Sequence, residues 1–519
     1  MDVILPIFIV SQMAGGVLAW VASQKSLALT RWLSLLTLVL NFIGAIIIWL
    51  QQPETEGTSS WLLDYSLPWI PQFGINFHLA LDGLSLLMLL LTFFLGAISI
   101  LISWKEIHNR AGLYHFCLLW VLAGITGVFL SMDLFLFFSF WEVMLIPMYF
   151  LIIIWGHENS RYAAFKFFIF TQASGLLMLV AILGLYFVHG NQTGNFTFDY
   201  FQLLGTNMPP GVAMWLMLGF LAAFVVKLPV VPFHTWLPDA HSQAPTAGSL
   251  ILAGLLLKTG AYGLLRFIIP LFRDQAMAIA PWAMAVGVLG IIYGAILAFS
   301  QTDLKRLVAY TSVSHMGFIM LGVFSFNELA AQGVVMQMIT HGISTGALFI
   351  LAGFIYERIH TRDITRMGGF WKSMPFLGTC GLVFAMASLG LPGLGNFVAE
   401  FLTLVGAWQA THKLTIIATI GLVAATIYSL RILQKVFYGT QSPTTVLIDL
   451  SIRERLVMVA LVVSIIWLGL FPQSVLDTSR QSVKVIIEAP ASGNESARTN
   501  KQTTQTKIVS IKRKGGRDE

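Results

Sequence analysis

Charged residues inside apolar segments are the part of this sequence most able to do chemistry. Lys227 lies in FVVKLPVVPF, two residues before Pro229, and Lys258 lies in the middle of the next apolar segment. A charge at mid-bilayer costs roughly 2.5–3.5 kcal/mol on insertion scales, so such residues usually serve a function. Pro229 removes one helical hydrogen bond, and broken helices at membrane depth line watery cavities. Charge and break together predict an ion path, although Lys258 has the alternative of binding a backbone carbonyl at a helix break.

Two carboxylic acids lie in similar apolar segments. Glu142 lies about ten residues into the segment 133–155, which is ~15 Å at 1.5 Å per residue. Glu400 follows LPGLGN, whose proline and glycines interrupt the segment 376–405. Lys227 is the partner of Glu142 by charge and depth, and a pair that forms and breaks can load and release a proton. The alternatives are a carboxylate held by a structural lysine at Glu142 and an acid at the membrane surface at Glu400.

Histidines in two neighbouring segments are candidates for a proton relay, because an imidazole titrates near neutral pH. His315 lies in YTSVSHMG, and His341 lies on a polar stripe with Gln337 and Thr345 one turn to either side. Two histidines at similar depth predict a path to Glu400. The alternative for each is a hydrogen-bonded packing residue.

A further polar group follows the break at Pro229 in the sequence HTWLPDAHS. We expect His234, Asp239 and His241 at the cytoplasmic end of the segment 211–230, where water reaches them. There the two histidines would guide protons from the cytoplasm into the protein. Alternatively, the three residues would cap the next helix. The spacing provides no third metal ligand. The sequence also lacks a Gly-rich phosphate loop, a CxxC pair and HExxH, which predicts no nucleotide, iron–sulfur cluster or zinc in this chain.

The elements that must position these residues are membrane helices. Of 519 residues, 57% are hydrophobic and 10% charged, a composition typical of an all-α polytopic membrane protein in a lipid bilayer. The basic residues form no patch, so we expect no nucleic-acid partner. Hydropathy predicts about fourteen spans, near 3–22, 29–50, 80–102, 112–131, 133–155, 166–188, 211–230, 246–268, 279–300, 306–325, 331–355, 376–405, 414–438 and 456–472. The seventh and the twelfth carry breaks.

The order of the spans predicts an internal repeat. Paired broken segments in corresponding positions are typical of inverted repeats around a transport path, here five spans each over 112–268 and 279–438. The membrane domain then covers 1–480, and 481–519 is a polar, disordered tail. The connection 51–79 predicts a hairpin on the outer surface. Alternate connections are rich in Lys and Arg, which predicts that they are cytoplasmic and that both termini lie outside.

The motifs resemble a known family. The runs KLPVVPFHTWLPDAHSQAPTAGS and KRLVAYTSVSHMGF resemble the signature of the antiporter-like membrane subunits of respiratory complex I. LDGLSLLM, ISWKEI, FWEVMLIPMYF, YERIHTRD and LPGLGNFVAEF resemble one branch of that family, over roughly 3–480. By this resemblance the proton-translocating residues are Glu142, Lys227, Lys258 and Glu400. Sister subunits typically have lysine at the last position, so glutamate there favours that branch.

The resemblance implies a proton-pumping subunit of the enzyme that transfers electrons from NADH to quinone, in the inner membrane of a bacterium. The chain itself would hold no redox centre, and NADH, FMN, iron–sulfur clusters and quinone would be bound by other subunits. It would pack beside other membrane-arm subunits, including two further antiporter-like ones. Two alternatives are a subunit of a multi-subunit sodium/proton antiporter and a structural subunit whose charges stabilise broken helices.

Overall fold

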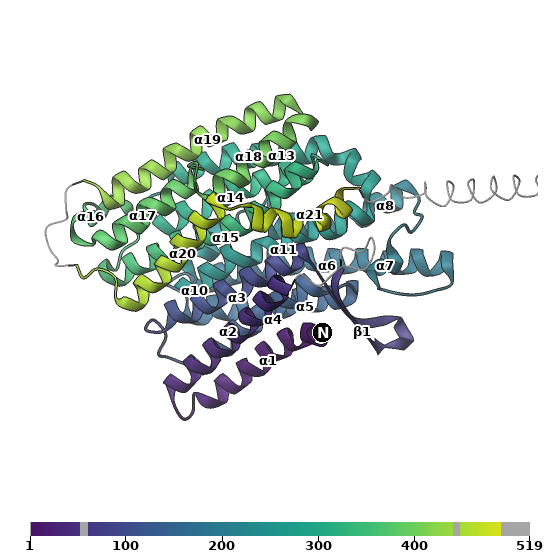
Figure 1. Ribbon diagram of the computed structural model, residues 1–519, viewed down its shortest axis with the longest axis horizontal. Helices are drawn as coiled ribbons and strands as arrows, with labels where there is room; N and C mark the ends of the chain where they lie inside the picture. The colour runs from purple at the N-terminus through teal and green to yellow at the C-terminus, as the bar shows by residue number, and fades with distance from the viewer. Residues whose placement is uncertain (1, 52–60, 440–446, 489–519) are drawn as a thin grey trace, which may run out of the picture.

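Apolar segments of helical length form one elongated bundle of helices (Figure 1), and the computed structural model describes residues 2–51, 61–439 and 447–488. The first half contains α1 Ile4–Ala22, α2 Leu27–Gln51, α3 Gly83–Ser103, α4 Ala111–Leu130, α5 Leu134–Trp155, α6 Ser160–Thr193, α7 Tyr200–Leu203, α8 Pro210–Lys227, α9 Trp236–Gln243, α10 Thr246–Ile251, α11 Leu257–Gly263 and α12 Ile269–Leu271. The second half contains α13 Arg273–Ser300, α14 Leu304–Val323, α15 Glu328–Ile359, α16 Phe370–Ser373, α17 Pro375–Ser388, α18 Gly395–Ala410, α19 His412–Ile432, α20 Ile452–Leu470 and α21 Gln473–Glu488.

The structure contains fewer helices that meet the length and apolarity needed to cross a membrane than the fourteen spans that hydropathy predicts. Within the described residues eleven helices are long and apolar enough to cross a membrane, or twelve if α20 and α21, bent by 67°, count as one span. Every predicted range overlaps at least one helix, and the predicted all-α polytopic fold is confirmed. The count of fourteen remains a prediction, because α14 carries Lys305, Arg306 and a polar stripe, and α17 is only 14 residues long.

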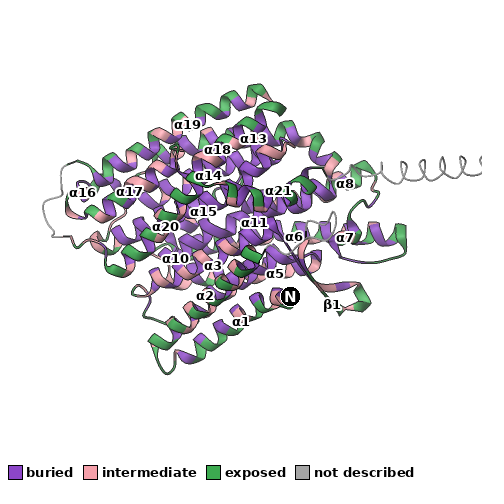
Figure 2. Ribbon diagram, in the orientation of Figure 1, coloured by how far each residue is buried: buried purple, intermediate pink, exposed green. Residues whose placement is uncertain are grey.

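Burial divides the bundle into a centre and a rim. The helical stretch Thr246–Leu271 and the part of α15 from Ala330 to Ile355 are completely buried, whereas only 28% of the apolar window of α2 is buried. Figure 2 shows the same division, with buried segments in the middle and exposed segments on the outer helices. Apolar side chains exposed on the rim suit a lipid environment. The two central elements carry Lys258 and His341, so both side chains are kept away from lipid.

Two strands cover one end of the bundle. β1, Trp61–Ile70, pairs antiparallel with β2, Ile75–Asp82, and the 3-10 turn η1, Pro71–Phe73, joins them. Gly74 has a φ of +65° at this turn, a conformation that glycine adopts without a Cβ clash. The hairpin expected in the connection 51–79 is therefore confirmed, while residues 52–60 lie outside the described residues.

Both predicted helix breaks are present. α8 ends at Lys227, and the chain makes turns past Pro229 before α9 begins at Trp236. The second break separates α17 from α18 and contains Gly390 and Gly393, whose φ values are +76° and +95°. Such conformations are available to glycine and end a helix.

The structure also contains breaks that the sequence analysis did not predict. Two π-helical segments, η2 Leu252–Leu256 and η3 Leu264–Ile268, flank α11, and a third, η5 Leu433–Phe437, follows α19. A short 3-10 turn, η4 Ile364–Arg366, follows α15. The predicted tail boundary at 480 is too early, because α21 continues to Glu488 and buries Val483 and Ile487. The rest of that tail, 489–519, lies outside the described residues.

Candidate functional site

Lys258 lies at the centre of the bundle, in α11 between two π-helical segments. Its side chain is completely buried. The amine donates a hydrogen bond to the carbonyl of Ala253 and lies 2.7 Å from Nδ1 of His341. A π-helical turn shifts the usual hydrogen-bond register, and such turns are frequent at functional sites. The amine thus binds a backbone carbonyl, as the structural alternative expects, and also contacts a titratable side chain, as a proton path requires.

Close approach of two helices makes the contact between Lys258 and His341 possible. Gly254 and Gly342 face each other, and a Cβ added at Gly342 would lie 2.9 Å from the carbonyl oxygen of Gly254. That distance is too short for any larger residue without a shift of the backbone. Small residues therefore bring α15 against the helix that carries Lys258.

The polar chain continues from His341 to Glu400. The rings of His341 and His315 are 5.5 Å apart between centroids, and Nδ1 of His315 lies 3.0 Å from Oε1 of Glu400. Glu400 is 2% exposed, and its Oε2 has no hydrogen-bond partner in the structure. α18 therefore packs Glu400 into the bundle rather than onto its surface. The structure brings together His315, His341 and Glu400, as the sequence predicted.

Glu142 and Lys227 are not in contact in this structure. Among the ion pairs of the described residues none joins them, and Oε1 of Glu142 and Nζ of Lys227 both lack a hydrogen-bond partner. The amine of Lys227 lies 4.9 Å from the ring centroid of Trp141, which is a cation–π contact. Lys227 still interacts electrostatically with Glu142. The ion pair that the sequence predicts between Glu142 and Lys227 is therefore not formed in this structure.

The two histidines after the break are more deeply placed than the sequence indicated. His241 is completely buried and His234 is 3% exposed, so the expectation that water reaches them is wrong. α9 turns back into the bundle, and the ring of His241 stacks on Phe349 at 4.3 Å. Neither ring nitrogen of His241 has a hydrogen-bond partner in the structure. Asp239, by contrast, forms ion pairs that hold α9 in place.

Residues that the sequence analysis did not single out surround a cavity at the Lys- and Arg-rich end. The cavity has a volume of about 490 Å³, and its lining includes Glu106, His157, Lys305 and Glu357. Burial raises the pKa of Glu106, and burial together with the charges of Lys305 and Arg362 lowers the pKa of His157 to about 4. The signal for this corner in the sequence was its place in the quoted runs, because ISWKEI contains Glu106, KRLVAYTSVSHMGF begins at Lys305 and YERIHTRD contains Glu357.

The family of the chain follows from comparison with known proteins. Residues 131–427 match the model of the NADH:quinone oxidoreductase/Mrp antiporter transmembrane family. The chain belongs to this family. The matched range includes all eight candidate residues, from Glu142 to Glu400.

Members of the NADH:quinone oxidoreductase/Mrp antiporter family resemble this chain over almost its full length. NADH-quinone oxidoreductase subunit M of Pseudomonas aeruginosa is 54% identical over 491 residues, which are 92% of this chain and 96% of that protein. The subunit M of Escherichia coli K12 is 52% identical over 492 residues, with 92% and 97% covered.

Two solved structures share the fold. A chain of respiratory complex I from Thermus thermophilus with bound NADH superimposes with a TM-score of 0.83 at 30% identity, with 93% of this chain and 99% of that chain covered. A chain of the Mrp complex from Dietzia sp. also gives a TM-score of 0.83, at 22% identity and with 93% and 97% covered. The second likeness shows the fold alone.

Proposed function

We propose that this chain is the proton-translocating membrane-arm subunit of an NADH:quinone oxidoreductase, complex I. The observation that carries the proposal is the buried chain Lys258, His341, His315 and Glu400, in which each residue faces the next across the centre of the bundle. Buried titratable groups of this kind are costly in a membrane and typically form proton paths. Relatives above 50% identity carry the name of such an oxidoreductase subunit.

Protons would move along this chain in steps between neighbouring groups. Lys227 and Glu142 would act as a switch, because the charge of each stabilises the charged form of the other when they approach. Lys258 would pass its proton to His341, and His315 would deliver it to Glu400. The unpartnered Oε2 of Glu400 is available to hold that proton. His234 and His241 would conduct protons toward this chain from the cytoplasmic side.

The complex would supply what this chain does not contain. NADH, FMN, iron–sulfur clusters and quinone would be bound by other subunits, and two further antiporter-like subunits would be lateral neighbours. The Lys- and Arg-rich connections would face the cytoplasm of a bacterium, with the chain in its inner membrane. The two breaks, five spans apart, support two inverted repeats over 112–268 and 279–438, because each half then contains one broken helix.

Purification followed by a pumping assay tests the proposal. After mild solubilisation, a tagged chain should copurify with NADH–quinone reductase activity, and the reconstituted complex should acidify vesicles on addition of NADH. The Lys258→Ala complex should assemble but neither pump nor turn over at the normal rate. An assembled Lys258→Ala complex with normal pumping would favour the purely structural alternative. Copurification with sodium/proton antiport and without reductase activity would favour the antiporter alternative.

A further inference from the structure

The cavity at the Lys- and Arg-rich end leads to two ionisable residues that the proposed proton chain does not include. It lies between the connections that follow α3 and α5 and the ends of α10, α14 and α15. Glu106 and Lys305 both form part of its wall, and a second cavity of about 690 Å³ shares His157 and Tyr356 with it. Together they give water access to this corner of the bundle.

Only one of the two carboxylate oxygens of Glu106 forms hydrogen bonds with the protein. Its Oε1 accepts hydrogen bonds from the backbone N–H and the hydroxyl of Thr246, both at 3.2 Å. Its Oε2 is buried and has no hydrogen-bond partner in the structure. Leaving a buried carboxylate oxygen unpaired costs free energy, so an oxygen in this state is suited to accept a proton or a water molecule.

Lys305 is a second buried amine beside this acid. Its side chain is 1% exposed although it lies next to a cavity. Nζ donates to the carbonyl of Ala244 at 2.9 Å and lies 3.5 Å from the hydroxyl of Ser249. An ammonium group has three N–H donors, so these two contacts leave one for the cavity. Glu106 interacts electrostatically with Lys305 and offsets part of the cost of burying its charge.

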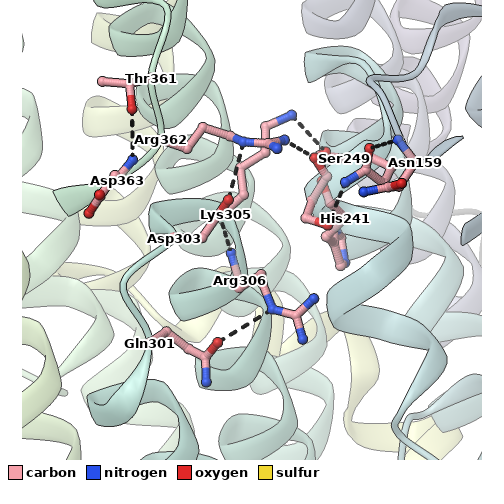
Figure 3. Close-up of polar contacts among 12 residues, drawn as sticks. Asn159, His241, Ser249, Gln301, Asp303, Lys305, Arg306, Thr361, Arg362 and Asp363 are labelled. Atoms are coloured by element: carbon pink, nitrogen blue, oxygen red, sulfur yellow. Dashed lines mark hydrogen bonds and ion pairs between the residues drawn. The ribbon is translucent and has the colours of Figure 1, made fainter.

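His241 lies on the inner side of Lys305. The hydroxyl of Ser249, which accepts from Lys305, donates to the carbonyl of His241 at 3.1 Å. Figure 3 shows Lys305 directed across to Ser249 on α10, with His241 on α9 nearby. The charges of Lys305 and Lys258 both act on the His241 ring, so the ring interacts electrostatically with both amines. Both of its ring nitrogens lack a partner in the structure.

We infer that Glu106 and Lys305 form a proton-loading site that takes protons from the cavity and passes them through His241 to Lys258. This inference rests on the proposed function and names the entry to its proton chain. In each transfer an N–H bond of Lys305 breaks, water carries the proton across, and an N–H bond forms on a ring nitrogen of His241, because no direct contact joins the two groups. The ring then gives a proton to the free amine of Lys258, and Lys305 recovers one from water in the cavity. One proton moves from the cavity to Lys258 at the centre of the bundle, and no electrons are transferred.

A structural role for Lys305 would predict a different set of mutant phenotypes. As a structural cation, Lys305 would only bind the carbonyl of Ala244 and neutralise Glu106. Arginine can do both, but its guanidinium does not release a proton at physiological pH. The variant Lys305→Arg therefore keeps the structural contribution and removes the transfer of a proton.

The test uses the whole complex in vesicles, with acidification on addition of NADH as the readout and native gels to check assembly. We expect Lys305→Arg and Lys305→Gln to assemble and to lose pumping to the level of uncoupled vesicles. Lys25→Gln, at an exposed lysine of the same end, should pump normally. Normal pumping by assembled Lys305→Arg would overturn the inference. If Lys258→Ala still loses pumping in that case, the proposed function stands without this entry site.

A second variant keeps the inference testable if Lys305→Arg does not assemble. Glu106→Gln preserves the acceptor for Thr246 but removes the negative charge that stabilises the ammonium of Lys305. Protonation of Lys305 then requires a lower pH, so the alkaline limb of the pumping profile should move to lower pH. The charged groups that act on Lys305 or line its cavity are Lys105, Glu106, His108, His157, His241, Asp303, Glu357, His360 and Arg362. An unchanged alkaline limb in Glu106→Gln would overturn the inference.

Discussion

The amine of Lys258 and Nδ1 of His341 lie 2.7 Å apart at the centre of the bundle. The two residues are 83 positions apart in sequence, and both side chains are completely buried. This contact is the junction between the lysine and the histidines of the proposed path. A substitution can remove proton transfer at this contact while keeping the hydrogen bond that holds the two helices together.

Replacement of His341 by asparagine tests that junction. The amide oxygen of the introduced side chain would take the place of Nδ1 and accept from Lys258, but an amide does not bind and release a proton. We expect His341→Asn to lower pumping and coupled quinone reduction to less than about a tenth, because a proton-transferring side chain contributes about 10²–10⁴-fold. His412→Asn, at an exposed histidine, should be unaffected. Normal pumping by His341→Asn would restrict His341 to holding the lysine.

The separation of Glu142 and Lys227 leads to a second prediction. Glu142→Gln keeps the shape of the side chain and removes the charge that favours the ammonium form of Lys227. We expect this variant and Lys227→Ala to assemble with NADH-driven pumping below about a tenth of normal. Electron flow and pumping should fall together, because the two processes are coupled. Glu158→Gln, at an exposed acid after the same helix, serves as the control, and wild-type pumping by assembled Glu142→Gln would refute the switch.

The contact of 3.0 Å between His315 and Glu400 leads to a third prediction. Glu400→Gln retains a hydrogen-bond acceptor for His315 but cannot bind and release a proton, so pumping should fall strongly in an assembled complex. Glu400→Lys should retain part of the activity, because a lysine also titrates. Vesicle acidification compares the two variants. Full pumping by Glu400→Gln would assign the end of the path to another residue.

A buried ion pair next to the hairpin leads to a prediction on stability. Asp82 and Arg266 are 2.5 Å apart, with side chains 0% and 3% exposed. Asp82→Asn keeps the hydrogen bond from the backbone N–H of Ser85 but leaves Arg266 unpaired, which should cost about 3–5 kcal/mol. Thermal inactivation of the solubilised complex measures the change.

The pair Asp477 and Arg480 provides the matched control for that measurement. These side chains are 2.9 Å apart and 59% exposed, so Asp477→Asn should cost less than about 1 kcal/mol. Equal thermal stability of the Asp82→Asn and unmodified complexes would mean that Arg266 finds another partner.

The final prediction concerns orientation in the membrane. The excess of Lys and Arg in alternate connections places the connection after α15 in the cytoplasm and the turn after α20 outside. A reporter fused after Arg366 should therefore be cytoplasmic, and one fused after Pro472 should be on the outer side. Both reporters on one side would contradict the fourteen-span order.

The positions of the ionisable residues along their helices and the two helix breaks were readable from the sequence. Apolar runs and prolines act over a few residues, so Lys227, Lys258 and the break before Glu400 could be located without knowledge of their neighbours. The same local reasoning found His315 and His341 on adjacent helices. Hydropathy averages over a window, however, so it did not distinguish the buried Lys305 from the other basic residues at helix ends.

Tertiary structure decided which of these groups meet. Side-chain contacts depend on how distant helices rotate and pack, so Lys258 contacts His341, whereas Glu142 and Lys227 remain apart. The burial of His241 and of Lys305 likewise depends on the turn that folds α9 back into the bundle. Local sequence determines where a residue lies along its own helix, whereas the face it shares with another helix is settled only when the helices pack.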